Sequence, residues 1–242
     1  MLSDYLKSLY QIRIFLLIIG IYVLTLGSLL SIYGYRDSFI IMNNNHCALL
    51  DWPMFIITHL GDSLILTSII SLIFIQKKPH TVILVILVVI TTGLISQVLK
   101  NVYFSEWDRP LKVFNESPLV YTLPNYRLFH NSFPSGHSIT AMAAFTALIW
   151  SLKPRLRVQI TLALAAVIIS YSRIYLGAHF PGDVLAGSLI GVITTLLLVP
   201  YAERIINKVK FNRTSLVIIM TIAILALLTG IWLLRVYFPH FQ

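Results

Sequence analysis

The residues best suited to chemistry lie in three short clusters, each beside a long apolar segment. Ionisable side chains in such places are costly and usually mark function. Together the clusters supply three cations, two imidazoles and one carboxylate: Lys100, Arg109, Arg173, His137, His179 and Asp183. This set suits the handling of a phosphoryl group, because positioned cations stabilise the negative charge on its oxygens.

The cations could form a cradle for phosphate. Arg109 and Arg173 each offer a planar fork that matches two phosphate oxygens, whereas Lys100 acts as a point charge. Ser135 and Gly136 follow a proline and precede an apolar run, so we expect a helix to begin there. The free N–H groups and dipole of a helix start attract anions.

The two histidines could carry the bond-making steps. His179 and Asp183 are four residues apart, so either a helix that begins early puts them on one face or a turn brings them together. A carboxylate bound to one imidazole nitrogen leaves the other nitrogen free to attack, which makes His179 the candidate nucleophile. His137 is the candidate general acid, because a histidine pKa lies near working pH.

Composition predicts an all-α fold, a polytopic transmembrane helical bundle. Of the 242 residues 57% are hydrophobic and 11% are charged, which is typical of a membrane protein. We expect one domain over residues 1–242. The net charge of +9 lies in short loops rather than in one patch, which argues against nucleic acid, and the single cysteine, Cys47, excludes a Cys-based metal site. Six core spans and a seventh, C-terminal span are expected at residues 14–33, 53–75, 81–99, 138–152, 158–176, 184–201 and 215–234.

Lysine and arginine predict the orientation. With the N-terminus inside, the inner segments hold eleven of these residues and the outer segments seven, in agreement with the positive-inside rule. All three clusters then fall outside, as does the C-terminal end with His240. For a bacterial chain, this places the protein in the inner membrane with a cytoplasmic N-terminus and a periplasmic site.

Some other residues receive mainly structural interpretations. Asp62 lies inside the second apolar run, where it could pair with a catalytic cation or sit protonated in helix packing. Gly177 and Gly182 are interpreted as loop glycines. Four aromatic residues are assigned to the interfacial belt: Trp52, Trp107, Tyr121 and Tyr126.

The clusters resemble the three-part signature of the type-2 phosphatidic acid phosphatase and vanadium haloperoxidase superfamily. Its parts are Lys-x6-Arg-Pro, Pro-Ser-Gly-His and Ser-Arg-x5-His-x3-Asp. Residues 134–137 and 172–183 match the second and third parts in full, and the likeness extends over about residues 99–201. The first part departs, because eight residues separate Lys100 from Arg109. Either the loop bulges by two residues, or the lysine assignment is weaker than the arginine assignment.

The resemblance implies hydrolysis of phosphate esters or pyrophosphates through a phosphohistidine, without a metal or other cofactor. In the matching positions, His179 resembles the nucleophile, Asp183 its orienting partner and His137 the general acid. The residues that resemble phosphate ligands are Lys100, Arg109, Ser135, Gly136 and Arg173. The family usually has six spans, so the seventh is an addition.

The expected activity is therefore that of a membrane lipid phosphatase whose partners are the bilayer and a lipid phosphate. Undecaprenyl pyrophosphate, phosphatidylglycerol phosphate, phosphatidic acid and a lipid A phosphate all qualify as substrates. A lipid-to-lipid phosphotransferase would use the same residues. A transporter or channel is a more distant alternative, and it would distribute its polar residues through the depth of the membrane. The sequence leaves the oligomeric state open.

Overall fold

The computed structural model describes residues 2–123 and 126–237, so His240 lies outside the described residues. Every regular element in this part of the chain is helical. The elements are α1 (Leu2–Gln11), α2 (Arg13–Asn43), α3 (Ala48–His59), α4 (Ser63–Phe74), α5 (Pro79–Val98), the π-helix η1 (Leu99–Tyr103), α6 (Pro110–Val113), α7 (Gly136–Leu152), α8 (Leu156–Tyr175), α9 (Pro181–Ile206) and α10 (Arg213–Tyr237).

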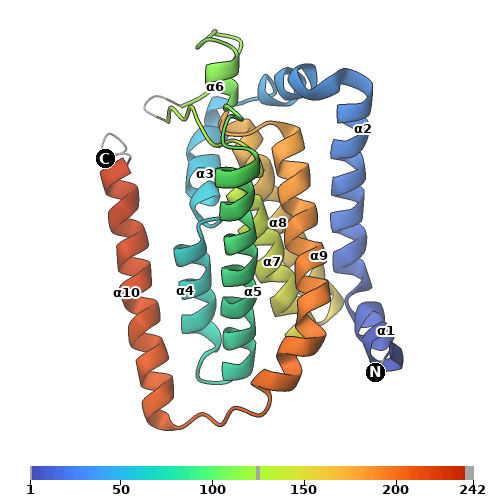
Figure 1. Ribbon diagram of the computed structural model, residues 1–242, viewed down its shortest axis with the longest axis vertical. Coiled ribbons are helices and arrows are strands. Elements are labelled where there is room, and N and C mark those ends of the chain that lie inside the picture. Colours follow the sequence, from blue (N-terminus) through green and yellow to red (C-terminus); the bar gives the residue numbers. More distant parts are fainter. Residues whose placement is uncertain (1, 124–125, 238–242) are drawn as a thin grey trace.

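The long helices run side by side in one bundle (Figure 1). Helices α2, α5 with η1, α8, α9 and α10 are each long and apolar enough to cross a membrane, and the bent pair α3 and α4 makes a sixth candidate. Each expected span coincides with one of these helices or with α7, which confirms an integral membrane helical bundle. Because α7 has 17 residues and falls short of that length test, a seventh crossing stays a prediction. The N-terminus and the α6 loop lie at opposite ends of the bundle (Figure 1).

The second expected span is not a continuous helix. Helices α3 and α4 meet at an angle of 75°. Asp62 caps the start of α4, because its Oδ1 accepts hydrogen bonds from the backbone N–H of Leu64 at 2.9 Å and of Ile65 at 3.2 Å. This capping role differs from the two roles that the sequence suggested for Asp62. Gly61 at the bend packs on His137, whose Cβ would lie 2.9 Å from a Cβ added to the glycine.

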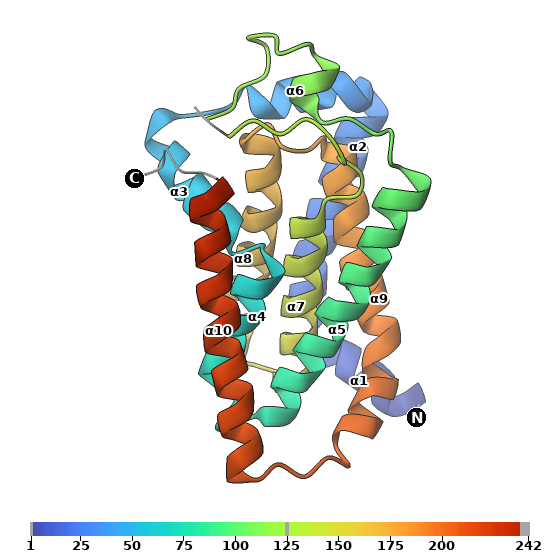
Figure 2. The same cartoon turned by 60° about the vertical axis from the view of Figure 1, so that its left-hand side comes forward.

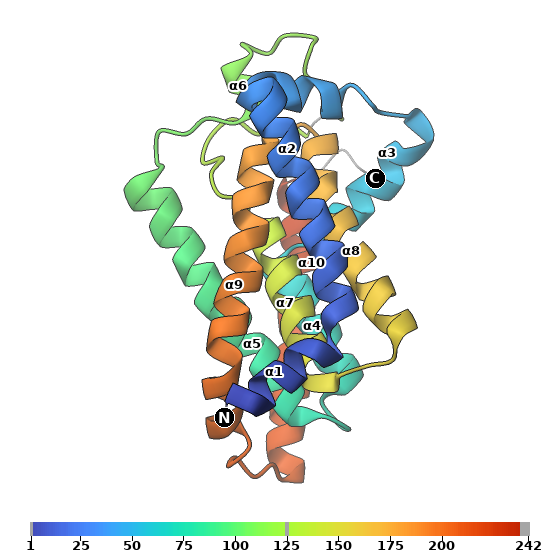
Figure 3. The ribbon, with the colours of Figure 1, turned by 90° about the vertical axis from the view of Figure 1, so that its right-hand side faces the viewer.

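Helix α2 has a sharp kink at Gly34, where φ is +75° and ψ is −177°. A left-handed φ of this kind strains any residue with a Cβ but not glycine. The expected end of the first span at residue 33 coincides with the kink, but the helix resumes and continues to Asn43. This second part of α2 turns across the end of the bundle (Figure 3). It thereby places Tyr35 over the start of α9.

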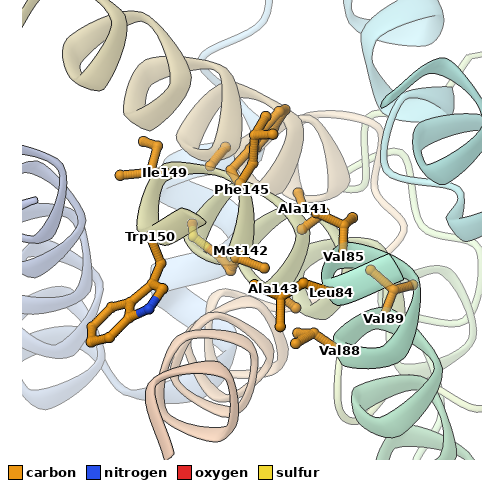
Figure 4. Packing of buried hydrophobic residues seen from close by; sticks show 14 of the residues in the cluster. Leu84, Val85, Val88, Val89, Ala141, Met142, Ala143, Phe145, Ile149 and Trp150 are labelled. Atoms are coloured by element: carbon orange, nitrogen blue, oxygen red, sulfur yellow. The ribbon is translucent and has the colours of Figure 1, made fainter. Parts of the chain in front are cut away.

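Helix α7 lies in the centre of the bundle, surrounded by its neighbours (Figure 4). Two glycines of α9 bring its backbone close to α7: a Cβ on Gly187 would lie 2.6 Å from the carbonyl oxygen of Ser135, and one on Gly191 would lie 2.7 Å from that of Ile139. Small residues allow such close helix packing in membranes. This contact places the starts of α7 and α9 side by side.

Candidate active site

His179 and Asp183 form a buried hydrogen-bonded pair. The Nδ1 of His179 lies 3.2 Å from the Oδ2 of Asp183, and the two side chains are 2% and 0% exposed. His179 lies in the loop before α9, and Asp183 lies in the first turn of α9, where its carboxylate also accepts the N–H of Phe180 at 3.0 Å. The second of the two expected arrangements, a turn, therefore joins the pair. Because the carboxylate accepts a hydrogen bond from Nδ1, that nitrogen carries the proton and Nε2 is unprotonated.

Two hydroxyls that sequence reasoning missed also hold the carboxylate of Asp183. Tyr35 donates to Oδ1, and Ser132 donates to Oδ2 at 2.5 Å. Gly182 makes room for the tyrosine, because a Cβ there would lie 2.2 Å from Cε2 of the Tyr35 ring. The loop interpretation of Gly182 is therefore wrong, whereas Gly177, with φ at +68°, does serve a turn. Ser132 stands beside the Pro-Ser-Gly-His motif, whereas no local signal marks Tyr35.

Arg109 faces the unprotonated nitrogen of His179. Its Nη1 lies 3.3 Å from Nε2 of His179 and donates to the carbonyl oxygen of Ala178 at 3.1 Å. Its Nε donates to the carbonyl oxygen of His130 at 2.6 Å. Burial, and then the charge of Arg173, lowers the pKa of Arg109 to about 10. The guanidinium is thus held in place by backbone carbonyls beside other cations, where an anion would be stabilised.

Lys100 reaches the same place as Arg109 despite the unusual spacing. The Nζ of Lys100 donates to the carbonyl oxygen of Asn131 at 2.7 Å, and the Nη2 of Arg109 donates to that oxygen at 3.4 Å. Lys100 lies in the π-helix η1, a form that adds a residue to a helical turn and is frequent at functional sites. Lys100 and Arg109 thus meet at one backbone carbonyl although eight residues separate them in the chain.

Arg173 is 2% exposed and is anchored by two side chains from other segments. Its Nη1 donates to Oγ1 of Thr58 at 2.7 Å and to the hydroxyl of Tyr126. Its Nε is buried without a hydrogen-bond partner among the described residues, so one N–H of the fork remains available for an oxygen of a substrate. Tyr126 is 3% exposed, so its assignment to the interfacial belt is wrong.

The other aromatic residues differ in their surroundings. The Tyr121 hydroxyl donates to Oδ2 of Asp51 at 2.5 Å, so it serves an internal contact rather than a membrane anchor. Trp107 packs on Phe133 with ring centroids 5.0 Å apart. Trp52 is 55% exposed, as an interfacial residue would be.

The start of α7 lies beside these groups. The backbone N–H of Ser135 donates to the carbonyl oxygen of Asp183 at 3.0 Å, so this N–H is not free for an anion as expected. The Oγ of Ser135 accepts a hydrogen bond from Ser138 at 2.9 Å and is still able to donate. The N–H groups of Gly136 and His137 belong to the first turn, which has no carbonyl partners within its own helix.

The electrostatics suit a neutral nucleophile. Burial, and then the positive charges of Arg109 and Lys100, lower the pKa of His179 well below its ordinary value. The imidazole is therefore uncharged at neutral pH, with a lone pair on Nε2. The chemically suited groups gather at one end of the bundle, which argues against the transporter alternative. Among the described residues no three His, Cys, Asp or Glu side chains are grouped so that they could hold a metal ion.

A mostly apolar groove of about 700 Å³ leads away from the site. It lies between α4, α5, α7 and α10, and its lining includes Gly136 and His137 at one end. The bundle therefore combines a cluster of cationic and imidazole side chains with a mostly apolar groove inside the membrane-spanning region. Fold and site together define a phosphatase of the membrane.

Comparison with known proteins agrees with this class. The sequence pattern of the PAP2 superfamily matches residues 81–207. Phosphatidylglycerophosphatase B of Bacillus subtilis is 33% identical over 161 residues, 62% of this chain and 73% of the relative. Undecaprenyl-diphosphatase of Sulfolobus acidocaldarius is 30% identical over 191 residues, 76% of this chain and 87% of the relative. The crystal structure of LpxE from Aquifex aeolicus has a TM-score of 0.61 at 30% identity and covers 69% of this chain and 95% of LpxE. The chain belongs to the PAP2 superfamily and is a membrane-embedded phosphatase.

Proposed function

We propose that this protein hydrolyses the phosphomonoester or pyrophosphate of a membrane lipid through a phosphohistidine intermediate. The observation that carries the proposal is the position of His179: Nδ1 is bound by Asp183, and Nε2 lies 3.3 Å from Nη1 of Arg109. A nucleophile thus faces the group that would hold the phosphate. The apolar groove that ends at His137 supports a lipid as the substrate.

In the first step, the lone pair of His179 Nε2 attacks phosphorus in line as the bond from phosphorus to the leaving oxygen breaks. His137 gives its proton to that oxygen, which leaves as the lipid alcohol or lipid phosphate. The forks of Arg109 and Arg173, together with Lys100, stabilise the charge on the phosphate oxygens in the transition state. Ser135 Oγ and the N–H of Gly136 add donors at the start of α7.

In the second step, water attacks the phosphorus of the phosphohistidine and the bond from nitrogen to phosphorus breaks. His137 now acts as a base and takes a proton from the water, which restores both histidines and releases inorganic phosphate. Asp183 stabilises the charge on the His179 ring in the first step, as the carboxylate of a catalytic triad does. Each group then returns to its starting protonation state.

The substrates of the relatives guide the choice of lipid. Phosphatidylglycerol phosphate, undecaprenyl pyrophosphate and lipid A phosphates are suggested by the names of similar proteins, and phosphatidic acid shares their chemistry. The inner membrane of a bacterium, with a cytoplasmic N-terminus and a periplasmic site, is the location that the distribution of lysine and arginine favours.

The test is phosphate release by the purified protein from a panel of these lipid phosphates, with a chelator present throughout. We expect release from at least one lipid, inhibition by vanadate, which mimics five-coordinate phosphorus, and no release by the His179→Ala variant. Full activity of that variant would contradict the assignment of the nucleophile. Transfer of phosphate to a second lipid, without free phosphate, would identify a phosphotransferase instead.

A further inference from the structure

Helix α10 lies at the edge of the bundle, beyond the part of the chain that matches the PAP2 superfamily, which ends at residue 207. It packs along α4, and Gly230 permits this contact, since a Cβ there would lie 2.8 Å from Cγ1 of Ile65. In Figure 2, α10 and α5 lie on either side of α7. The residues that match the superfamily therefore give no role to α10.

One face of α10 forms a wall of the apolar groove. Ile219, Ile222, Ala223 and Ala226 line it, and their spacing of three, four and seven residues is that of a single helix face. The neighbouring Leu225 is not among the residues that line the groove. The small side chain of Ala226, on the face that lines the groove, leaves space beside α10.

The groove is continuous with the site and extends far from it. Its lining on α5 runs from Ile83 to Gln97, a distance of about 21 Å at the rise of an α-helix. Half of a typical hydrocarbon core is about 15 Å. From the end lined by Gly136 and His137, the groove is thus long enough to extend past the middle of the bilayer.

We propose that this groove binds the hydrocarbon chain of the substrate and that α10 is a specificity-determining wall that favours long-chain lipid phosphates. The inference rests on the proposed function. A phosphate at the start of α7 places the attached chain at the mouth of the groove, where apolar side chains replace neighbouring lipid. Contacts with a part of the substrate remote from phosphorus then contribute to catalysis, because binding energy from remote groups is used to lower the barrier.

The test compares a short-chain and a long-chain lipid phosphate with the same headgroup, at matched detergent concentration. In the wild-type protein, kcat/KM should rise with chain length. Ala226→Trp should lower kcat/KM for the long-chain substrate by about tenfold and leave the short-chain value within about twofold. Ile90→Trp, on the α5 wall of the groove, should act in the same way. Leu225→Trp on the outer face of α10 is the matched control and should change neither value.

The outcomes separate this inference from the proposed function. An equal fall for both substrates in Ala226→Trp, in protein that elutes as wild type does on size exclusion, would overturn the tail-binding role, and so would unchanged kinetics in both groove variants. A fall confined to the long chain supports it even if one of the two variants fails to fold. If the wild-type protein hydrolyses both substrates without regard to chain length, the proposed function stands and the role of α10 is wrong. If no lipid phosphate of the panel is hydrolysed at either chain length, the proposed function itself fails.

Discussion

Tyr35, in the kinked first long helix, donates a hydrogen bond from its hydroxyl to Oδ1 of Asp183, 148 residues further along the chain. The carboxylate that holds His179 is therefore positioned by a residue outside the segment that matches the superfamily, residues 81–207. Phe180 packs against the same tyrosine ring, with centroids 4.8 Å apart. The first long helix thus serves the site as well as the bundle.

Tyr35→Phe should lower kcat about tenfold, because a hydrogen bond to a charged group contributes about 1.5–3 kcal/mol. Without this donor, the negative charge of Asp183 is less stabilised and favours the protonated ring of His179 more strongly. The pKa of His179 should therefore rise, and the acid limb of the pH–rate profile should move to higher pH. The measurement is kcat as a function of pH. Tyr33→Phe is the control, because Tyr33 is 48% exposed on the same helix. An unchanged kcat with an unshifted profile would mean that the Tyr35 hydroxyl has no role beyond packing of its ring.

Gly182→Ala should destabilise the protein and reduce its activity. The added Cβ would lie 2.2 Å from the Tyr35 ring, and overpacking of this kind costs about 1–3 kcal/mol. The measurement is thermal stability in detergent together with phosphate release. Gly27→Ala is the matched control in α2, since nothing lies within 4 Å of a Cβ there and alanine is a better helix former. Equal stability of the two variants would contradict the contact with Tyr35.

Lys100→Ala should reduce kcat/KM about a hundredfold, because a cation that stabilises the transferred phosphoryl group is lost. Lys112→Ala should change it less than about twofold, because the exposed ion pair of Lys112 with Asp108, 3.0 Å long, contributes little. Both lysines flank the Arg-Pro pair, so the comparison tests which of them serves the site. A larger effect at Lys112 would reverse the assignment.

The lowered pKa of His179 predicts activity that persists into acid. Protonation removes the lone pair that attacks, so kcat/KM should fall with decreasing pH through an apparent pKa below the ordinary value of about 6.5. Folding stability should also decrease as the pH falls below about 6.5, since the unfolded chain then binds a proton that the folded site resists. The measurement is kcat/KM as a function of pH with a soluble short-chain substrate. An acid limb with its midpoint well above pH 6.5 would contradict this electrostatic account.

The fold could be predicted largely from sequence, because long apolar runs leave few alternatives to helices in a membrane. The six clustered residues that could do chemistry lie together at one end of the bundle, as expected from their places beside the ends of apolar segments. What could not be predicted depends on tertiary packing. The contact of Tyr35 with Asp183 and the burial of Tyr126 against Arg173 join distant segments, and the cap made by Asp62 follows from a bend that apolar composition does not encode.

The spacing of Lys100 and Arg109 shows a second limit. Motif comparison treats two extra residues as a departure, whereas in the structure both side chains reach the carbonyl of Asn131. A sequence motif gives only the number of residues between two positions, whereas a phosphate site requires side chains that are close in three dimensions.

The central claim is that the phosphoryl group passes to Nε2 of His179. The most direct measurement is mass spectrometry of the peptide that contains His179 after rapid quenching of turnover in alkali, which preserves phosphohistidine. We predict phosphorylated His179 in the wild-type protein quenched during turnover, and none in His179→Ala. Phosphate on another residue, or turnover by His179→Ala at the wild-type rate, would contradict the account.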